Sequence, residues 1–130
     1  MTQLVIRVRI ATALLFLMLT GCITVPAPTA ADTAAADYGA QPTRYANVVH
    51  AYFDATMKDP SSVQYREIGQ PTKGYIAHGG GALVSKYVTY GWQVTATINA
   101  KNAYGGYVGF KTYTFLFRGE QIVDQLNPGD

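Results

Sequence analysis

The chain of 130 residues contains one cysteine, Cys22, and only two histidines, His50 and His78. A single cysteine cannot form a disulfide within the chain, so the fold depends on its hydrophobic core. Two histidines this far apart match none of the recognised metal-site spacings, and we therefore expect no metal and no cofactor. A nucleophile, base and acid cannot be assembled around them either, so the sequence does not predict an enzyme.

The N-terminal apolar run is too short to cross a bilayer. Residues 10–19 are apolar apart from Thr12, and Arg7 and Arg9 precede them. A spanning helix needs about 20 apolar residues, and glycine and proline interrupt the run soon after residue 19. A positive start, a short apolar core and small residues at its end are typical of a secretory signal peptide, which we place at residues 1–21.

The signal ends in Leu19-Thr20-Gly21-Cys22, which resembles the lipobox of bacterial lipoproteins. The resemblance implies signal cleavage between Gly21 and Cys22, and lipidation of Cys22 through a thioether, with an acyl chain of the palmitate kind on its amino group. Ile23 in place of Asp fits sorting to the outer membrane, with the domain facing the periplasm. Two alternatives stay open: ordinary cleavage near residues 29–31, which gives a soluble secreted form, and an uncleaved anchor.

The charge balance changes once the signal is removed. The chain has ten basic and eight acidic side chains, and ten minus Arg7 and Arg9 leaves eight of each. A neutral domain without Lys/Arg clusters lacks the electrostatic footprint of nucleic-acid binding, so no nucleic-acid partner is expected. It also lacks a polybasic stripe for acidic lipids, so the lipid on Cys22 is the expected contact with the membrane.

Residues 22–42 are expected to form a lipidated tether. They are rich in Ala, Thr and Pro, and Asp32 and Asp37 are their only charges. So little apolar surface does not offset the entropy of ordering the segment. A flexible linker of this length spans roughly 25 Å, which would hold the domain just off the membrane.

Residues 43–58 have the spacing of an amphipathic helix. Apolar side chains recur three and four residues apart from Tyr45 to Met57. Thr43 is the expected N-cap, and Pro60 is expected to end the helix because it disfavours helical geometry at the preceding residue. Polar Asn47 and Asp54 lie on the opposite face.

The rest of the chain has the pattern of β-strands. Strands are predicted at residues 63–68, 75–77, 83–88, 90–99, 107–118 and 121–126. The clearest alternates strictly: Trp92, Val94, Ala96 and Ile98 face one way, and polar residues face the other. We therefore predict an α+β fold for residues 43–130, one N-terminal helix packed on an antiparallel meander of four to five strands.

Two segments resemble a set of small, mostly uncharacterised bacterial envelope proteins. One is Asp59-Pro60-Ser61-Ser62-Val63-Gln64-Tyr65, and the other is Asn-Ala-Lys-Asn-Ala-Tyr-Gly-Gly-Tyr-Val-Gly at residues 99–109. The resemblance covers most of residues 45–123, although those proteins often carry a cysteine in the strand before the second segment and this chain does not. It implies an architecture and lends no activity.

The second segment is also the candidate partner-binding loop. Its candidate residues combine amide, lysine, tyrosine and glycine side chains: Asn99, Lys101, Asn102, Tyr104, Gly105, Gly106 and Tyr107. Asparagine and the paired glycines are typical of a structural turn, whereas tyrosine flanking them is typical of contact surfaces. Both interpretations stay open, and the turn is favoured.

Three functions are considered for the folded part. The first is a non-enzymatic interaction module at the outer membrane, which binds an envelope protein or the cell wall. The second is an inhibitor or immunity-type lipoprotein that blocks an envelope hydrolase through residues 101–107. The third, a small envelope hydrolase, is disfavoured because His50 and His78 are dispersed in the sequence.

Overall fold

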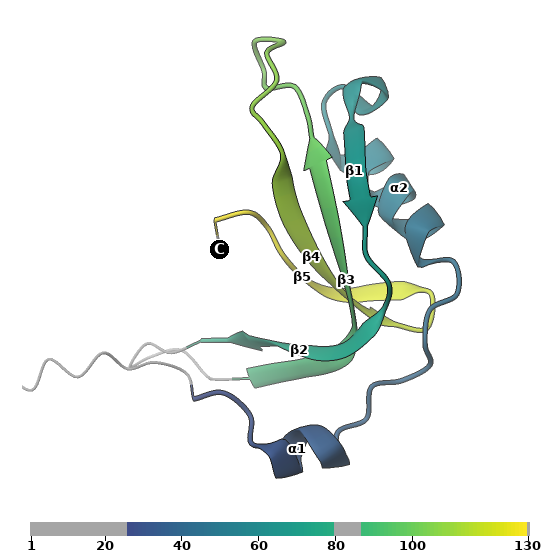
Figure 1. Ribbon diagram of the computed structural model, residues 1–130, viewed down its shortest axis with the longest axis vertical. Coiled ribbons are helices and arrows are strands. Elements are labelled where there is room, and N and C mark those ends of the chain that lie inside the picture. Colours follow the sequence, from purple (N-terminus) through teal and green to yellow (C-terminus); the bar gives the residue numbers. More distant parts are fainter. Residues whose placement is uncertain (1–25, 80–86, 130) are drawn as a thin grey trace, which may run out of the picture.

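A computed structural model of the chain describes residues 26–79 and 87–129. These residues form two α-helices, a short 3₁₀ turn and one five-stranded antiparallel sheet (Figure 1). The helical elements are α1 (Ala30–Ala35), α2 (Tyr45–Thr56) and η1 (Pro60–Ser62). The strands are β1 (Gln64–Ile68), β2 (Thr72–His78), β3 (Tyr87–Asn99), β4 (Lys111–Arg118) and β5 (Gln121–Leu126). The predicted combination of a helix with an antiparallel sheet is confirmed.

Strand β3, with 13 residues, organises the sheet. Along one edge it pairs with β2 through its first half and with β1 through its second half, and along the other edge it pairs with β4. Strand β5 then pairs with β4. Strands β2, β3, β4 and β5 follow one another as antiparallel neighbours, as predicted. Strand β1 lies beyond β2 along the same edge of β3.

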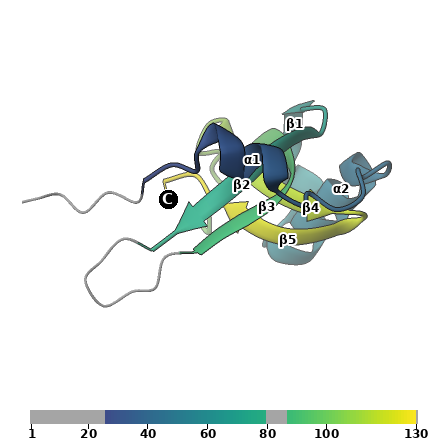
Figure 2. The same cartoon turned by 90° about the horizontal axis from the view of Figure 1, so that it is seen from below.

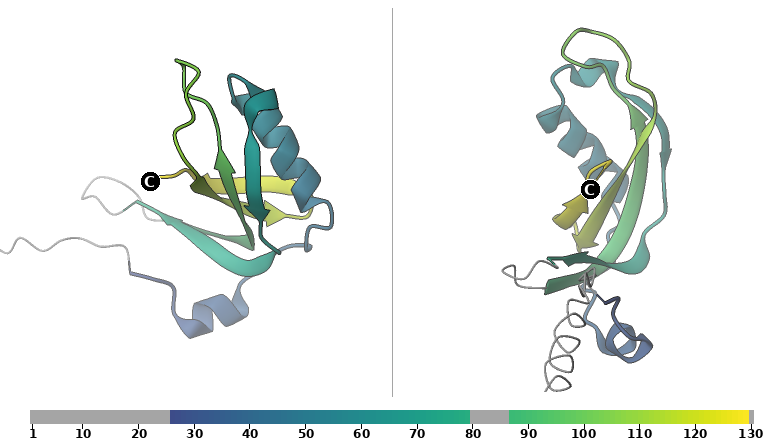
Figure 3. Two further views of the ribbon diagram at one scale, coloured as in Figure 1. Left: turned by 45° about the horizontal axis from the view of Figure 1, so that its top comes forward. Right: turned by 90° about the vertical axis from the view of Figure 1, so that its left-hand side faces the viewer.

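The sheet bends sharply where two glycines face each other across β2 and β3. Gly74 is the register partner of Gly91. A Cβ atom built on Gly91 would lie 2.6 Å from the backbone oxygen of Phe117 and 2.9 Å from Cγ of Leu116. The missing side chain therefore lets Leu116 and the neighbouring backbone approach closely, which is what glycine in a strand interior often permits. Figures 1 and 3 show the β2–β3 hairpin leaving the rest of the sheet at this bend.

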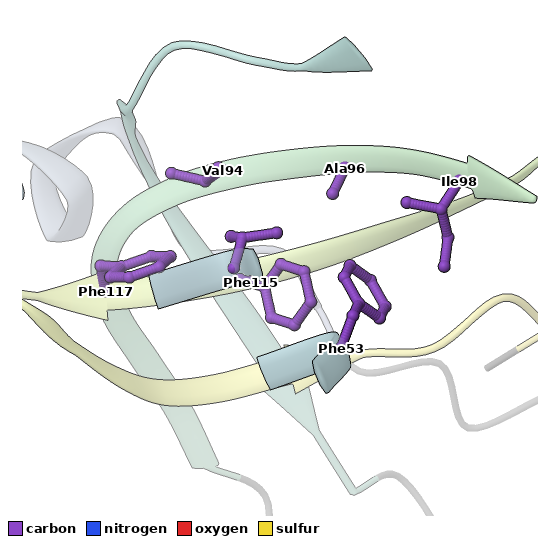
Figure 4. Close-up of a cluster of buried hydrophobic side chains, with 7 residues drawn as sticks. Phe53, Val94, Ala96, Ile98, Phe115 and Phe117 are labelled. Atoms are coloured by element: carbon purple, nitrogen blue, oxygen red, sulfur yellow. The ribbon is translucent and has the colours of Figure 1, made fainter. Parts of the chain in front are cut away.

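Helix α2 packs on one face of the sheet and forms the main core with it. The fully buried members come from α2, β3 and β4, and Figure 4 shows most of them pointing toward one another. They are Val49, Phe53, Val94, Ala96, Ile98, Phe115 and Phe117. The Phe53 and Phe115 rings meet edge to face at 5.8 Å, a geometry that adds to the energy of area burial.

The opposite face of the sheet is less polar than its alternation predicts. Thr95 and Thr97 lie there half-buried, as expected for a wetter face, but Ile76 and Leu116 are buried. The bend at Gly91 folds the β2–β3 hairpin toward this face, so Ile76 and Leu116 gain cover that a flat sheet would not give. A pattern read from one strand cannot show this curvature.

The start of helix α2 differs from the prediction. The helix begins at Tyr45, its N-cap position is Arg44, and no side chain of that residue caps it. Thr43 is not the N-cap. Instead, a carboxylate from the β4–β5 turn, Glu120, accepts hydrogen bonds from the Thr43 N–H at 2.9 Å, the Thr43 hydroxyl at 2.8 Å and the Arg44 N–H at 3.0 Å. These bonds, with the Thr43 backbone bond contributing most, lower the pKa of Glu120 below its ordinary value.

The second half of the expected tether is docked on the domain. Residues 30–35 form α1, which begins with a capping box between Thr29 and Asp32. After it, the Trp92 indole N–H donates to the Gly39 carbonyl at 3.0 Å, and the Gly119 N–H donates to the Ala40 carbonyl at 2.7 Å. Viewed from below, α1 lies across the β2–β3 hairpin (Figure 2). The Tyr38 ring also meets the Tyr90 ring edge to face at 5.9 Å. Sequence composition underestimated the order of this segment, because its hydrogen bonds to the domain use backbone carbonyls, which any residue offers.

The strand boundaries agree with the predictions in part. Strands β1 and β5 lie where they are expected, and β2 is longer than residues 75–77 because it continues along β3. The predicted strands 83–88 and 90–99 are one strand from Tyr87 onward, and residues 83–86 lie outside the described part of the chain. Strand β4 begins at Lys111, not at residue 107, because residues 107–110 belong to the preceding loop.

Candidate functional site

The β3–β4 loop, residues 100–110, projects from one end of the molecule. Figures 1 and 3 show it beyond the ends of β3 and β4, at the opposite end of the longest axis from α1. The turn of η1 and the start of β1 lie beside it. All eleven of its residues are exposed or half-exposed, so the loop is a surface feature whose shape must come from its own hydrogen bonds.

Two asparagines give the loop its shape. At its tip, the Asn102 side-chain oxygen accepts from the N–H groups of Tyr104 and Gly106, each at 3.0 Å. The Asn102 N–H in turn donates to the Gly106 carbonyl at 2.8 Å. At its base, the buried Asn99 accepts from the Gly109 N–H at 3.0 Å and donates to the Gln64 side chain at 3.2 Å. These bonds are the local Asx-type pairing that asparagine offers.

Two glycines have the backbone conformations that the loop requires. Gly105 has φ +83° and Gly109 has φ +93°, whereas Gly106 does not have a positive φ. Other residue types pay a steric cost in that region. Of the paired glycines Gly105 and Gly106, whose type is typical of a turn, only Gly105 therefore uses the conformation that favours glycine.

The loop is fastened to the turn at residues 59–62. The Tyr107 hydroxyl donates to the Ser62 carbonyl at 3.0 Å. Lys101 lies 3.9 Å from the Asp59 carboxylate and pairs with Tyr107 in an isolated β-bridge. The Ser61 hydroxyl donates to Asp59 at 2.7 Å and is the main cause of the lowered pKa of that carboxyl. The two segments singled out in the sequence thus meet in space.

The loop carries most of the exposed large apolar side chains of the described residues. Of six such side chains, four lie in it: Tyr104 is 97% exposed, Val108 50%, Tyr107 45% and Phe110 39%. Tyr104 stands at the tip and makes no side-chain hydrogen bond that the structure describes. Exposed apolar side chains gathered in one loop make this loop a candidate contact surface.

One part of this surface is missed by the sequence prediction. The Arg66 guanidinium lies 3.7 Å from the centre of the Phe110 ring, a cation–π contact that covers one ring face. Arg66 comes from β1 and lies 44 positions away from Phe110 in the chain. Val108 and Phe110 are ordinary strand residues in composition, so only the late start of β4 shows that they belong to the loop.

The candidate residues therefore divide into two groups. Asn99, Asn102, Gly105 and Tyr107 hold the loop in shape, while Tyr104 and, in part, Lys101 are presented to solvent. Gly106 contributes its amide and carbonyl to the Asn102 bonds. The lipidation and cleavage residues Cys22 and Gly21 lie outside the described residues.

A second polar cluster lies at the bent side of the sheet. The His78 imidazole Nε2 is 2.7 Å from a carboxylate oxygen of Asp124, and the Tyr87 ring stacks on the imidazole at 4.9 Å. This pair joins β2 to β5, two outer strands that do not pair with each other in the sheet. The contact bridges two strands of the described chain. In the sequence His78 stands out only as one of two dispersed histidines, and nothing there predicts its contact with Asp124.

Within residues 26–79 and 87–129, no group of three or more His, Cys, Asp or Glu side chains could hold a metal ion. No helix in the same ranges combines the length and hydropathy of a membrane span. Comparisons with protein-family models, with curated proteins and with solved structures gave no match. The interpretation of the site therefore depends on the geometry of its residues.

Proposed function

We propose that the chain is a lipid-anchored lipoprotein of the bacterial outer membrane whose folded part is a non-enzymatic interaction module. The lipobox-like Leu19-Thr20-Gly21-Cys22 supports the anchor, with the domain on the periplasmic side. The β3–β4 loop is the contact element, and its partner is an envelope protein.

The observation that carries this proposal is the fully presented Tyr104 on a loop that is held by hydrogen bonds. Tyrosine combines a large apolar ring with a polar tip and loses little side-chain entropy on binding. The Asn102 bonds fix the backbone around it before any partner is met, and a pre-organised loop keeps more of its contact energy as affinity. Truncation of such an anchor typically costs at least about 2 kcal/mol of binding energy.

The shape of the loop favours a concave partner. The tip projects beyond the sheet (Figure 1), and Val108 and Phe110 add exposed apolar side chains to the same loop. A protruding tip inserts into a cleft more readily than it covers a flat surface. This shape supports the second candidate function, in which the partner is an envelope hydrolase and the loop occupies its cleft as an inhibitor or immunity-type lipoprotein.

Photo-crosslinking in intact cells tests the proposal. A photoreactive phenylalanine derivative replaces Tyr104 in one strain and Val123 in another; Val123 is 42% exposed but lies on β5. We expect a discrete protein adduct from position 104 that position 123 does not give. Excess unmodified protein should compete the adduct away, and the Tyr104→Ala protein should not.

Identical adducts from both positions, or competition by the Tyr104→Ala protein at the same concentration, would contradict the loop as the contact element. Mass spectrometry of the adduct separates the two candidate functions. A hydrolase whose activity falls on addition of the domain indicates the inhibitor, and a partner without hydrolytic activity indicates the interaction module.

A further inference from the structure

The end of the molecule opposite the β3–β4 loop has its own surface, here called the tether-end surface. It consists of Pro26, Pro28 and α1 together with Tyr87, Val88 and Tyr90 of β3. An open groove of about 400 Å³ runs between these two parts. Figures 1 and 2 show α1 and the first turn of the described chain beside the start of β3.

The tether-end surface is apolar and almost free of charge. Tyr87 is 57% exposed, and α1, with the sequence AADTAA, buries none of its residues. Asp32 is the only charged residue among those that line the groove. Its carboxylate accepts from the Thr29 hydroxyl at 2.7 Å and from the Thr29 N–H at 2.9 Å, and these bonds, the hydroxyl bond first, lower the pKa of Asp32.

The short segment between Cys22 and Pro26 limits how far the tether-end surface can lie from the membrane. Only three residues lie between Cys22 and Pro26, and the four residue steps from Cys22 to Pro26 reach at most about 14 Å when fully extended. The headgroup layer on each side of a bilayer is about 5–7 Å thick. A lipid on Cys22 therefore holds Pro26 within or just above that layer.

We infer that the tether-end surface lies on the outer-membrane bilayer, with Tyr87 in the interfacial layer. The inference rests on the proposed lipid anchor at Cys22. Tyrosine is enriched at membrane interfaces because its ring is apolar and its hydroxyl remains hydrated. Docking at this surface points the β3–β4 loop away from the membrane, toward partners in the periplasm.

Depth-dependent quenching tests the inference on the lipidated full-length protein. Once Cys22 is lipidated, a cysteine introduced by Tyr87→Cys is the only thiol, and it accepts an environment-sensitive fluorophore. Tyr104→Cys provides the matched control on the loop. Each labelled protein is reconstituted in phosphatidylethanolamine–phosphatidylglycerol vesicles that contain lipids with a nitroxide near the headgroup. We expect at least twofold quenching at position 87 and none at position 104.

Equal quenching at both positions, or none at either, overturns the inference while mass spectrometry still shows the lipid on Cys22. The proposed function then stands. Absence of the lipid from Cys22 would overturn both. A third protein carries about 20 flexible residues inserted between positions 25 and 26. It shows whether the tether-end surface binds the bilayer itself or is only held near it by the lipid on Cys22. Quenching at position 87 should stay above that at position 104 in this protein, and loss of the difference would contradict an affinity of the surface itself.

Discussion

Gly91 is the residue at which the bend of the sheet can be tested. A Cβ atom there meets backbone and the branch point of Leu116, neither of which can move freely. The same atom at Gly74 meets mainly the side chain of Gln93, whose amide end can swing away. We expect Gly91→Ala to lower the free energy of unfolding by about 3 kcal/mol and Gly74→Ala by less than about 1 kcal/mol. Urea denaturation measures both, and equal losses would show that the bend does not depend on Gly91.

Glu120 makes the stability of the helix start depend on pH. Its pKa is lower in the folded chain than in the unfolded chain, because the charged form accepts bonds from Thr43 and Arg44. A lowered folded-state pKa adds stability above the unfolded-state pKa, and that stability is lost as the pH falls through the folded-state pKa.

The expected result is a steeper loss of stability in the wild type than in Glu120→Gln between about pH 5 and about pH 3. The urea midpoints of the two proteins, measured across this range, give the comparison. Parallel curves would mean that Glu120 does not hold the helix start. Other carboxylates, such as Asp32 and Asp59, titrate in both proteins and cancel in the difference.

At the scale of single residues, the sequence predicts the local conformation of a residue better than its contacts with residues far away in the chain. The amide and glycine chemistry of Asn102 and Gly105 is visible as a turn pattern. The partners of Glu120 are not, because the carboxylate and Thr43 lie 77 positions apart and meet only when α2 crosses the β4–β5 turn. The pairing of His78 with Asp124 is hidden for the same reason.

At the scale of elements, the two faces of the sheet make different contributions to stability. Phe115 lies on the helix face, is fully buried and contacts Tyr52 and Phe53. Thr95 lies on the other face and is half-buried. We expect Phe115→Ala to cost about 3–5 kcal/mol and Thr95→Ala to cost within about 1 kcal/mol. Calorimetry of the two variants would contradict this assignment if their melting temperatures fell equally.

The periodicity of α2 and β3 was sufficient to predict that these elements exist and which faces meet. Val49 and Phe53 recur at helical spacing, and Val94, Ala96 and Ile98 alternate. The curvature was beyond such patterns, since Gly91 reads as an ordinary interruption of a strand. The order in residues 30–42 was also missed, because α1 has no buried residue and the following segment docks through backbone carbonyls and a single aromatic ring, Tyr38.

At the scale of the whole molecule, the first described residues, which follow the proposed anchor in the sequence, and the proposed contact loop lie at opposite ends (Figures 1 and 3). The anchor depends on one sulfur atom. Cys22→Ser should abolish incorporation of a palmitate analogue and leave unprocessed precursor, because the thioether cannot form. Metabolic labelling followed by gel electrophoresis measures both the incorporation of the analogue and the amount of precursor. Label retained on the serine variant would rule out the lipid anchor.

The contact loop can present Tyr104 in one place only if its hydrogen bonds persist in solution. Amide hydrogen exchange measures this directly on the chain without residues 1–21 and with Cys22→Ser. In the wild-type loop, the N–H groups of Tyr104 and Gly106 should exchange at least about tenfold more slowly than in an unstructured chain. Asn102→Ala should remove that protection and leave the Gly109 amide, which is bonded to Asn99, protected. Exchange of the Tyr104 and Gly106 amides at the unstructured rate before any substitution would contradict a pre-organised contact loop.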